Sequence, residues 1–165
     1  RSMALIHERL YQSADFAGVD FGEYIRQLID YLYRTYKMTH DDIELKLDVD
    51  IPLLSIDMAI PCGLLLNELI SNCLKHAFPD ATSGCIRVSL LNDGLATVLS
   101  VSDDGAGFKS DVDFRNTASF GLQLFDMLVE QLGGEVKLST APGSTITVRF
   151  PKPMTESSLC PRLTS

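Results

Sequence analysis

The sequence predicts an α+β two-layer sandwich, in which helices cover one face of a mixed, mostly antiparallel sheet. Two kinds of periodicity support this prediction. In several segments apolar residues recur at every third or fourth position, which indicates amphipathic helices. In other segments apolar and polar residues alternate, which indicates half-buried strands. With 165 residues and 45% apolar content, the chain is long enough for one globular domain with a sizeable core.

The predicted elements can be placed along the chain. We expect residues 1–13 to be the end of a helix that starts upstream, and residues 15–20 to be a turn. The predicted helices are Phe21–Lys37, a helix that includes Leu64–Phe78, and Phe120–Leu132. The predicted strands are Ile43–Val49, Leu53–Ile56, Cys85–Leu91, Ala96–Ser102, Val136–Thr140 and Thr145–Phe150. Asp57 is expected to cap the second of these helices, which tolerates Pro61 because that proline lies near its first turn.

The composition excludes several classes of protein. A net charge of −8 argues against a nucleic-acid-binding surface, which needs clustered Lys and Arg. The longest uncharged apolar run, residues 58–66, is far shorter than the roughly 18 residues that span a bilayer, so we expect no membrane segment. The four cysteines show no Cys-x-x-Cys spacing, and we interpret them as free thiols rather than a disulfide framework. They favour a reducing compartment and therefore a cytoplasmic location.

The segment Leu64–Phe78 carries two stripes of different character. Its apolar stripe would pack on the sheet and consists of Leu66, Leu69, Ile70, Cys73 and Ala77. Its polar stripe combines a carboxylate, a carboxamide, an ammonium group and an imidazole, in Glu68, Asn72, Lys75 and His76. Side chains at positions i and i+4 of a helix lie one above the other. A face of such mixed chemistry is more typical of a site than of a surface that only needs to be soluble.

A second candidate site follows the predicted strand Ala96–Ser102. Asp103, Gly105 and Gly107 form an Asp-x-Gly-x-Gly pattern, in which glycines allow the backbone to approach a ligand closely. The aspartate could accept a hydrogen bond from an exocyclic amine. Taken alone, the pattern fits an ordinary Asp-Gly loop equally well.

Other motifs fail on inspection. A dinucleotide fingerprint would need glycine at Ser110, and a P-loop is interrupted by Phe108. The zinc-protease pattern that begins at His7 fails because its second histidine position is Tyr11. We interpret His7 and His40 as solvated surface residues.

The ordered motifs resemble the ATP-binding domain of sensor histidine kinases. Residues 67–78, followed by residues 103–108, resemble two motifs of that family. Residues 119–124 resemble its second glycine box, and residues 142–144 its closing glycine element. The resemblance implies the Bergerat ATP-binding fold, which is shared with gyrase, MutL and a heat-shock chaperone. Residues 2–13 resemble the end of the second dimerisation helix in the subgroup that has the second type of phosphoacceptor domain.

The resemblance implies three parts. Residues 1–13 would end a dimerisation helix, residues 14–151 would form the ATP-binding domain, and residues 152–165 would be a disordered tail. The phosphorylated histidine would lie on a preceding helix, so His7 is not expected to be that residue.

The resemblance also implies a role for each motif residue. Asn72 would bind Mg²⁺, and Glu68 would act as a base or orient a water in phosphoryl transfer. Asp103 would bind the adenine amine, with Ser144 near the adenine. The other residues implied to contact ATP are Lys75, His76, Gly105, Gly107, Gly121 and Leu122. The second glycine box has Ser119 in place of a glycine, and the segment between Phe108 and Phe120 is short, so the nucleotide would be less enclosed. Arg115 in that segment either reaches the γ-phosphate or is solvated.

The implied function is a protein-histidine kinase that uses ATP and Mg²⁺. Its partners would be the phosphoacceptor helices of the same protein and a response regulator, and the full-length protein would be a homodimer. One alternative is a nucleotide-gated interaction module without productive phosphotransfer, against which Glu68 argues. Another is an anti-sigma-type serine kinase, against which residues 1–13 argue because such kinases lack dimerisation helices of this kind.

Overall fold

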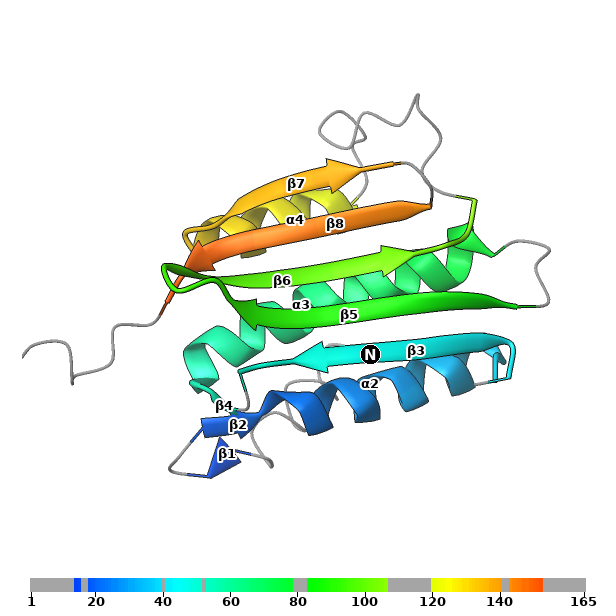
Figure 1. The fold of residues 1–165 in the computed structure, drawn as a ribbon, viewed down its shortest axis with the longest axis horizontal. Coiled ribbons are helices and arrows are strands. Elements are labelled where there is room, and N and C mark those ends of the chain that lie inside the picture. The colour runs from blue at the N-terminus through cyan, green and yellow to red at the C-terminus, as the bar shows by residue number, and fades with distance from the viewer. Residues whose placement is uncertain are drawn as a thin grey trace, which may run out of the picture.

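The structure is a computed structural model, and it describes residues 14–15, 18–39, 41–51, 53–78, 83–106, 120–140 and 143–152. The largest feature is a five-stranded sheet with the strand order β3-β5-β6-β8-β7. Helices α3 and α4 lie behind this sheet, and α2 runs along its β3 edge (Figure 1). The predicted α+β sandwich with helices on one face is thereby confirmed.

The pairing within the sheet makes it mixed but mostly antiparallel. Only β3 and β5 pair in parallel, whereas β5–β6, β6–β8 and β7–β8 are antiparallel. The strands of this sheet are β3 (Ile43–Val49), β5 (Gly84–Asn92), β6 (Ala96–Asp103), β7 (Glu135–Ser139) and β8 (Ser144–Pro151). These bounds agree with the predicted strands to within one or two residues, because more buried and more accessible side chains largely alternate along each strand, as expected.

A small second sheet precedes the main one and connects distant parts of the chain. It has the order β1-β2-β4, with strands β1 (Ala14–Asp15), β2 (Gly18–Asp20) and β4 (Leu53–Leu54). The prediction of a turn over residues 15–20 is therefore wrong for most of that segment. Its extended conformation depends on pairing between β2 and β4, a partner that lies too far along the chain for local patterns to reveal.

The helices begin and end close to the predicted positions. Helix α2 (Phe21–Tyr36) begins at Asp20, whose carboxylate accepts a hydrogen bond from the Glu23 N–H at 3.0 Å. Helix α4 (Phe120–Gln131) ends just before Gly133, whose φ is +61°. The third helix, α3, spans Ile56–Asn72.

The start of α3 corrects two predictions. The N-cap residue is Ser55, and Asp57 lies within the first turn, where its charge favours the positive end of the helix dipole. Pro61 lies inside the helix, beyond the first turn. The helix accommodates Pro61 although that residue supplies no N–H for the hydrogen-bond ladder. The helix is firmly packed around this proline, since its own residues Ala59, Cys62 and Leu65 are fully buried.

The end of α3 also differs from a regular helix. Residues Cys73–Ala77 form a π-helical turn, η1, which continues directly from Asn72. The sequence predicted one uninterrupted helix through Phe78, because a single wider turn leaves no distinct pattern in the residues. Such wide turns inside helices occur frequently at functional sites.

The core lies between the sheet and the helices. Its largest fully buried side chains are Phe21, Phe150, Ile25, Ile29, Ile43, Leu65, Leu66, Leu69, Ile70, Ile86 and Leu90. Helices α2 and α3 approach each other closely where the Tyr24 ring lies against Gly63. A side chain on Gly63 would collide with that ring, so the glycine allows the two helices to pack. No helix among the described residues has the length and apolar character needed to cross a bilayer.

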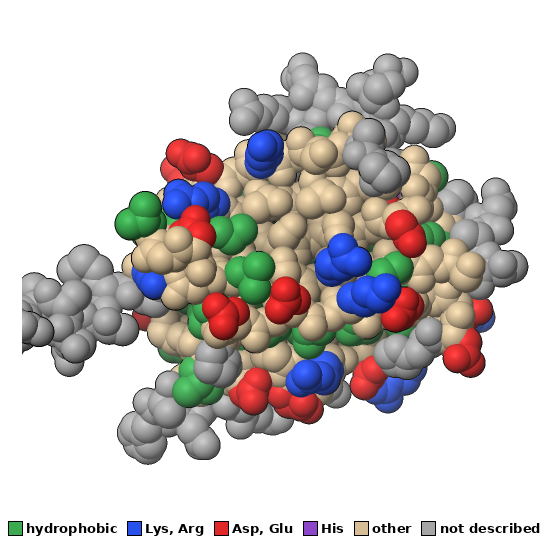
Figure 2. Space-filling view, in the orientation of Figure 1, with side chains coloured by type: hydrophobic (Ala, Val, Ile, Leu, Met, Phe, Trp, Pro, Cys, Tyr) green, Lys and Arg blue, Asp and Glu red, His purple; other side chains and the backbone are tan. Residues whose placement is uncertain are grey.

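No described helix or strand covers the opposite face of the sheet, which carries many polar side chains. Its side chains include Ser100 on β6 and Thr147 on β8, whose hydroxyl oxygens lie 3.2 Å apart. Figure 2 views the molecule from this side, and its charged side chains lie mainly around an uncharged central area.

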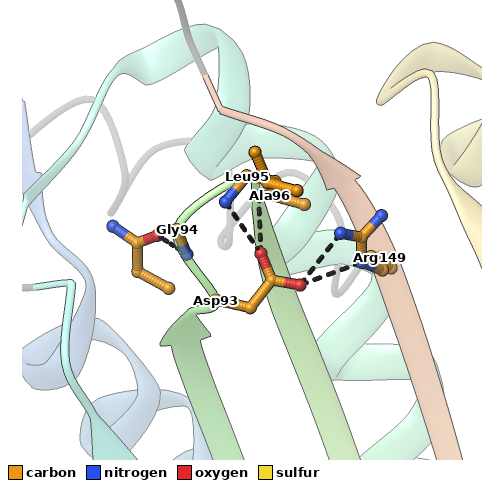
Figure 3. Close-up of polar contacts among 6 residues, drawn as sticks. Asp93, Gly94, Leu95, Ala96 and Arg149 are labelled. Carbon is orange, nitrogen blue, oxygen red and sulfur yellow. Dashed lines mark hydrogen bonds and ion pairs between the residues drawn. The ribbon is translucent and has the colours of Figure 1, made fainter.

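The turn between β5 and β6 is held by Asp93 (Figure 3). One oxygen of its carboxylate accepts hydrogen bonds from the Leu95 and Ala96 N–H groups, at 3.1 and 2.7 Å. The other oxygen pairs with the Arg149 guanidinium of β8 at 3.0 Å. These contacts, led by the bond from Ala96, lower the pKa of Asp93. The turn is therefore tied both to its own backbone and to the neighbouring strand.

Candidate functional site

The last turns of α3 present the polar residues beside the core, as predicted. Leu66, Leu69 and Ile70 are buried, whereas Glu68 and Asn72 are only half-buried and lie one turn apart. The Asn67 amide nitrogen lies 3.5 Å from Oε1 of Glu68, close enough for a long hydrogen bond. Glu68 and Asn72 are therefore placed on a firmly packed helix with their polar groups reaching its accessible side.

The π-helical turn has two buried and two exposed residues after Cys73. Leu74 and Ala77 are buried, and Lys75 and His76 are exposed. The Lys75 ammonium nitrogen lies 5.7 Å from the centroid of the Tyr36 ring, at the end of α2. In this conformation Lys75 contacts α2 rather than the end of β6.

Asp103 is the most enclosed carboxylate of the site. It is the last residue of β6 and is only 5% exposed. Its Oδ1 atom accepts a hydrogen bond from the Gly105 N–H at 3.1 Å. Its Oδ2 atom accepts from the Ser144 hydroxyl and from the Cys73 thiol, whose sulfur is 3.5 Å away. Asp103 therefore joins the start of β8 and the π-helical turn to the end of β6.

Two glycines allow the backbone to close around Asp103. The Gly105 Cα lies so close to the Ala77 carbonyl that an added Cβ would overlap the carbonyl oxygen. The same carbonyl accepts a hydrogen bond from the Ala106 N–H at 2.8 Å. Gly143 has a φ of +71°, and an added Cβ there would overlap the Asp103 carbonyl oxygen. Close packing of the loops after β6 and before β8 thus requires glycine at both positions.

The structure joins some of the predicted residues by hydrogen bonds and does not describe the side chains of others. Asp103, Gly105 and Ser144 are joined by hydrogen bonds, and Asn72 directly precedes Cys73, which contacts Asp103. Gly121 and Leu122 lie in the first turn of α4, and the side chain of Leu122 is not among those described. Gly107, Arg115, Ser119 and His40 lie outside the described residues, as do residues 1–13 and 153–165.

Cys73 was predicted to belong to the core, but it contacts Asp103 of the candidate site. Its helical spacing placed Cys73 in the apolar stripe of the predicted helix, and a free cysteine usually behaves as a small apolar residue. The structure instead leaves it half-buried, with its thiol directed at Asp103. Burial is the main cause that raises the pKa of the Cys73 thiol, and the Asp103 charge adds to it. The only sequence feature that could have identified Cys73 is its position directly after Asn72.

The donor set at the end of α3 fits a magnesium ion held mainly by phosphate oxygens. Mg²⁺ prefers oxygen ligands and is usually bound through one or two protein groups together with substrate phosphates. Asn72 offers a carboxamide oxygen, and Glu68 offers a carboxylate one turn earlier. Within the described part of the chain, no group of three or more His, Cys, Asp and Glu side chains could hold a metal by itself.

Two protein families match the chain. Residues 1–36 match a family described as histidine kinase, the HisKA_2 type. Residues 59–154 match the family described as histidine kinase-, DNA gyrase B-, and HSP90-like ATPase.

Individual relatives are histidine kinases. Blue-light-activated histidine kinase 2 of Erythrobacter litoralis is 29% identical over 147 residues, which are 83% of this chain and 42% of that protein. Sensor histidine kinase PdtaS of Mycobacterium tuberculosis is 27% identical over 91% of this chain and 30% of its own length. The chain thus spans less than half the length of these two relatives.

A solved structure shares the fold as well. The histidine kinase domain of the blue-light-activated kinase EL346 from Erythrobacter litoralis superposes with a TM-score of 0.79 at 25% identity, covering 90% of this chain and 72% of that one. The predicted resemblance to histidine kinases and to the Bergerat fold is confirmed. Because the second family match extends over more than half of the 165 residues, this chain belongs to the family of histidine kinase-, DNA gyrase B- and HSP90-like ATPases.

Proposed function

We propose that this chain is the ATP-binding catalytic domain of a sensor histidine kinase. It would bind Mg-ATP and transfer the γ-phosphoryl group to a histidine of a phosphoacceptor helix, for relay to an aspartate of a response regulator. The observation that carries this proposal is the buried Asp103 carboxylate beside the end of α3, where Glu68 and Asn72 lie. The Asp103 carboxylate could bind the adenine base of ATP, and the polar residues at the end of α3 could bind its phosphates.

At the base end of the site, Asp103 would accept a hydrogen bond from the adenine amine. Its carboxylate is oriented by Gly105 and Ser144, so no rearrangement of Asp103 is needed when the base enters. Ser144 would lie beside the adenine, and Gly105 and Gly107 would allow the backbone to approach it. Ser144 takes this role with a hydroxyl group already bonded to Asp103.

At the phosphate end, Asn72 would bind Mg²⁺, which neutralises phosphate charge when it is present. Glu68 would accept the proton of the attacking group or orient it. Gly121 and Leu122 would offer backbone N–H groups in the first turn of α4, where the helix dipole favours anions. The exposed His76 and Lys75 would contact phosphates, and Lys75 would first leave the Tyr36 ring.

The remaining parts of the proposal concern the longer protein. Residues 1–13 would end a dimerisation helix, residues 14–151 would form the catalytic domain, and residues 152–165 would be a tail. The full-length protein would act in the cytoplasm as a homodimer. The match of residues 1–36 to the HisKA_2 family of histidine kinases supports the assignment of residues 1–13 to a dimerisation helix.

Asn72→Asp tests the magnesium assignment. The added negative charge would repel the phosphates and disturb metal binding, so we expect Mg-dependent ATP binding to be lost while the circular dichroism spectrum is unchanged. Asn92→Asp, at the β5–β6 turn, adds the same charge away from the site and serves as the control. An unchanged Mg-ATP affinity of the Asn72→Asp chain in calorimetry would remove Asn72 from the metal site.

Glu68→Gln distinguishes a kinase from a nucleotide-gated module. In the full-length protein, this variant should bind ATP with nearly wild-type affinity but fail to phosphorylate the acceptor histidine, because the amide cannot accept a proton. Transfer is measured with radiolabelled ATP. Normal autophosphorylation of the variant would exclude Glu68 from the mechanism. If the wild type does not autophosphorylate either, the nucleotide-gated interaction module is favoured.

A further inference from the structure

The hydrogen bonds of Asp103 leave only part of its carboxylate free for a ligand. An ionised carboxylate has about four acceptor positions, two on each oxygen. Both positions on Oδ2 are occupied, by the Ser144 hydroxyl and the Cys73 thiol. One position on Oδ1 is occupied by the Gly105 N–H. Among the described residues, these contacts leave a single acceptor position, on Oδ1.

We propose that Cys73 is a positioning residue, which holds Asp103 so that this one free acceptor position selects a base with an exocyclic amine. This inference rests on the proposed function, in which Asp103 binds the adenine amine. The thiol and the Ser144 hydroxyl approach Oδ2 from different elements, the π-helical turn and the start of β8. Two donors from two sides restrict the rotation of the carboxylate more than either donor alone.

The place of Cys73 in the chain gives this contact a second consequence. Cys73 is the first residue of the π-helical turn and directly follows Asn72. Ala77, at the other end of this turn, accepts the hydrogen bond from Ala106 and packs against Gly105. The turn therefore touches Asp103 at its start and the following loop at its end. Through Cys73, the base end of the site is fixed relative to the residue proposed to bind Mg²⁺.

Two replacements at Cys73 separate the donor from the volume of the side chain. Cys73→Ala removes the donor and frees the second acceptor position of Oδ2, whereas Cys73→Ser keeps a donor of similar size. Cys62→Ala is the matched control, because Cys62 is a fully buried thiol of α3. Each chain is titrated with ATP and with ITP in the presence of Mg²⁺. ITP carries a carbonyl oxygen in place of the adenine amine and an N1–H donor beside it.

We expect the wild type to prefer ATP. Cys73→Ala should lower the ATP affinity by about threefold to tenfold, as expected for one hydrogen bond. The ratio of ATP to ITP affinity should also fall, because a carboxylate that can rotate can accept from the N1–H of ITP. Cys73→Ser should retain both the affinity and the ratio, and Cys62→Ala should retain the ratio.

Three results would overturn the inference while leaving the proposed function intact. The first is a Cys73→Ala chain with the affinity and the ratio of the wild type. The second is an equal impairment of Cys73→Ala and Cys73→Ser, which would indicate that volume matters and not the donor. The third is a Cys62→Ala chain in which the ratio of ATP to ITP affinity falls as much as in Cys73→Ala. Absence of ATP binding to the wild type would overturn the proposed function itself, and this inference with it.

Discussion

Among the described residues of the candidate site, Asp103 joins three segments of the chain by hydrogen bonds. Its carboxylate receives hydrogen bonds from Gly105, Ser144 and Cys73, which belong to three separate segments. A buried charge is tolerated only when such donors replace the water it has lost. The donors explain how β6 can end in a charged residue that is nearly inaccessible to solvent.

Ser144→Ala is expected to weaken both stability and nucleotide binding. Removing a donor to a buried carboxylate typically costs about 1–3 kcal/mol, so the free energy of unfolding should fall by that amount. Ser144→Thr keeps the hydroxyl and is the matched control. Urea denaturation measures the stability, and calorimetry the ATP affinity. Equal behaviour of the alanine and threonine variants would show that the hydroxyl is not what matters at this position.

Individual site residues were predictable to different degrees. Asp103 and Ser144 could be proposed as site residues because they lie in short motifs that resemble a known family, in the expected order along the chain. Cys73 could not be proposed in this way, because hydrophobic periodicity counts a cysteine only as an apolar residue of the helix. Its contact with Asp103 joins residues 30 positions apart, and no local pattern contains that information.

At the scale of elements, the π-helical turn is the feature that most affects the site. It ends α3 so that Cys73 meets Asp103 and the Ala77 carbonyl meets the loop after β6. The sequence predicted the helix through its apolar stripe, and the structure confirms α3. The stripe could not reveal the wider turn, because the partners that favour it, Gly105 and Ala106, come from another part of the chain.

Gly105→Ala tests the contact between the loop and the π-helical turn. The added methyl group would overlap the Ala77 carbonyl oxygen, which is backbone and cannot swing away. We expect a loss of about 2 kcal/mol in the free energy of unfolding and a marked loss of ATP affinity, because the hydrogen bond from Gly105 to Asp103 would shift.

Gly133→Ala is the control for this prediction. Gly133 has a φ of +61° and no atom within 4 Å of an added Cβ, so its replacement costs stability through backbone strain alone. Its ATP affinity should remain that of the wild type. If Gly105→Ala binds ATP as well as Gly133→Ala does, the loop contact is not needed for the site.

At the scale of the whole molecule, the two-layer arrangement followed directly from hydrophobic periodicity. Each strand and helix has one apolar face, and burying all of these faces together leaves few architectures. The parallel pairing of β3 with β5 and the small sheet β1-β2-β4 were not predicted. Both depend on contacts between distant segments rather than on the sequence of either strand.

The contact between α2 and β3 makes the stability of the fold depend on pH in alkaline solution. The Tyr33 hydroxyl donates a hydrogen bond to the Ile43 carbonyl at 2.7 Å, and burial raises the pKa of Tyr33 from 10.0 to about 12. The unfolded chain therefore loses this proton first. The contribution of Tyr33 to stability is complete below pH 10 and is lost as the pH rises toward 12.

Tyr33→Phe should therefore change the pH profile as well as the stability. We expect the variant to be less stable at pH 7, because the Ile43 carbonyl loses its donor, and to lose less further stability between about pH 10 and 12. Urea denaturation across this range measures both effects. A variant whose alkaline profile parallels that of the wild type would assign the pH dependence to other groups, such as Cys62, whose pKa burial also raises.

The central claim is that the site around Asp103 binds the base of ATP. Calorimetric titration of the chain with Mg-ATP, compared between the wild type and Asp103→Asn, tests it most directly. The control is Asp104→Asn, which changes the neighbouring exposed carboxylate that accepts from the Cys85 N–H at 2.7 Å. We predict that Asp103→Asn loses at least about tenfold in affinity, the effect of losing a charged hydrogen bond, whereas Asp104→Asn binds as the wild type does. Equal ATP affinity of the wild type and Asp103→Asn would contradict the account.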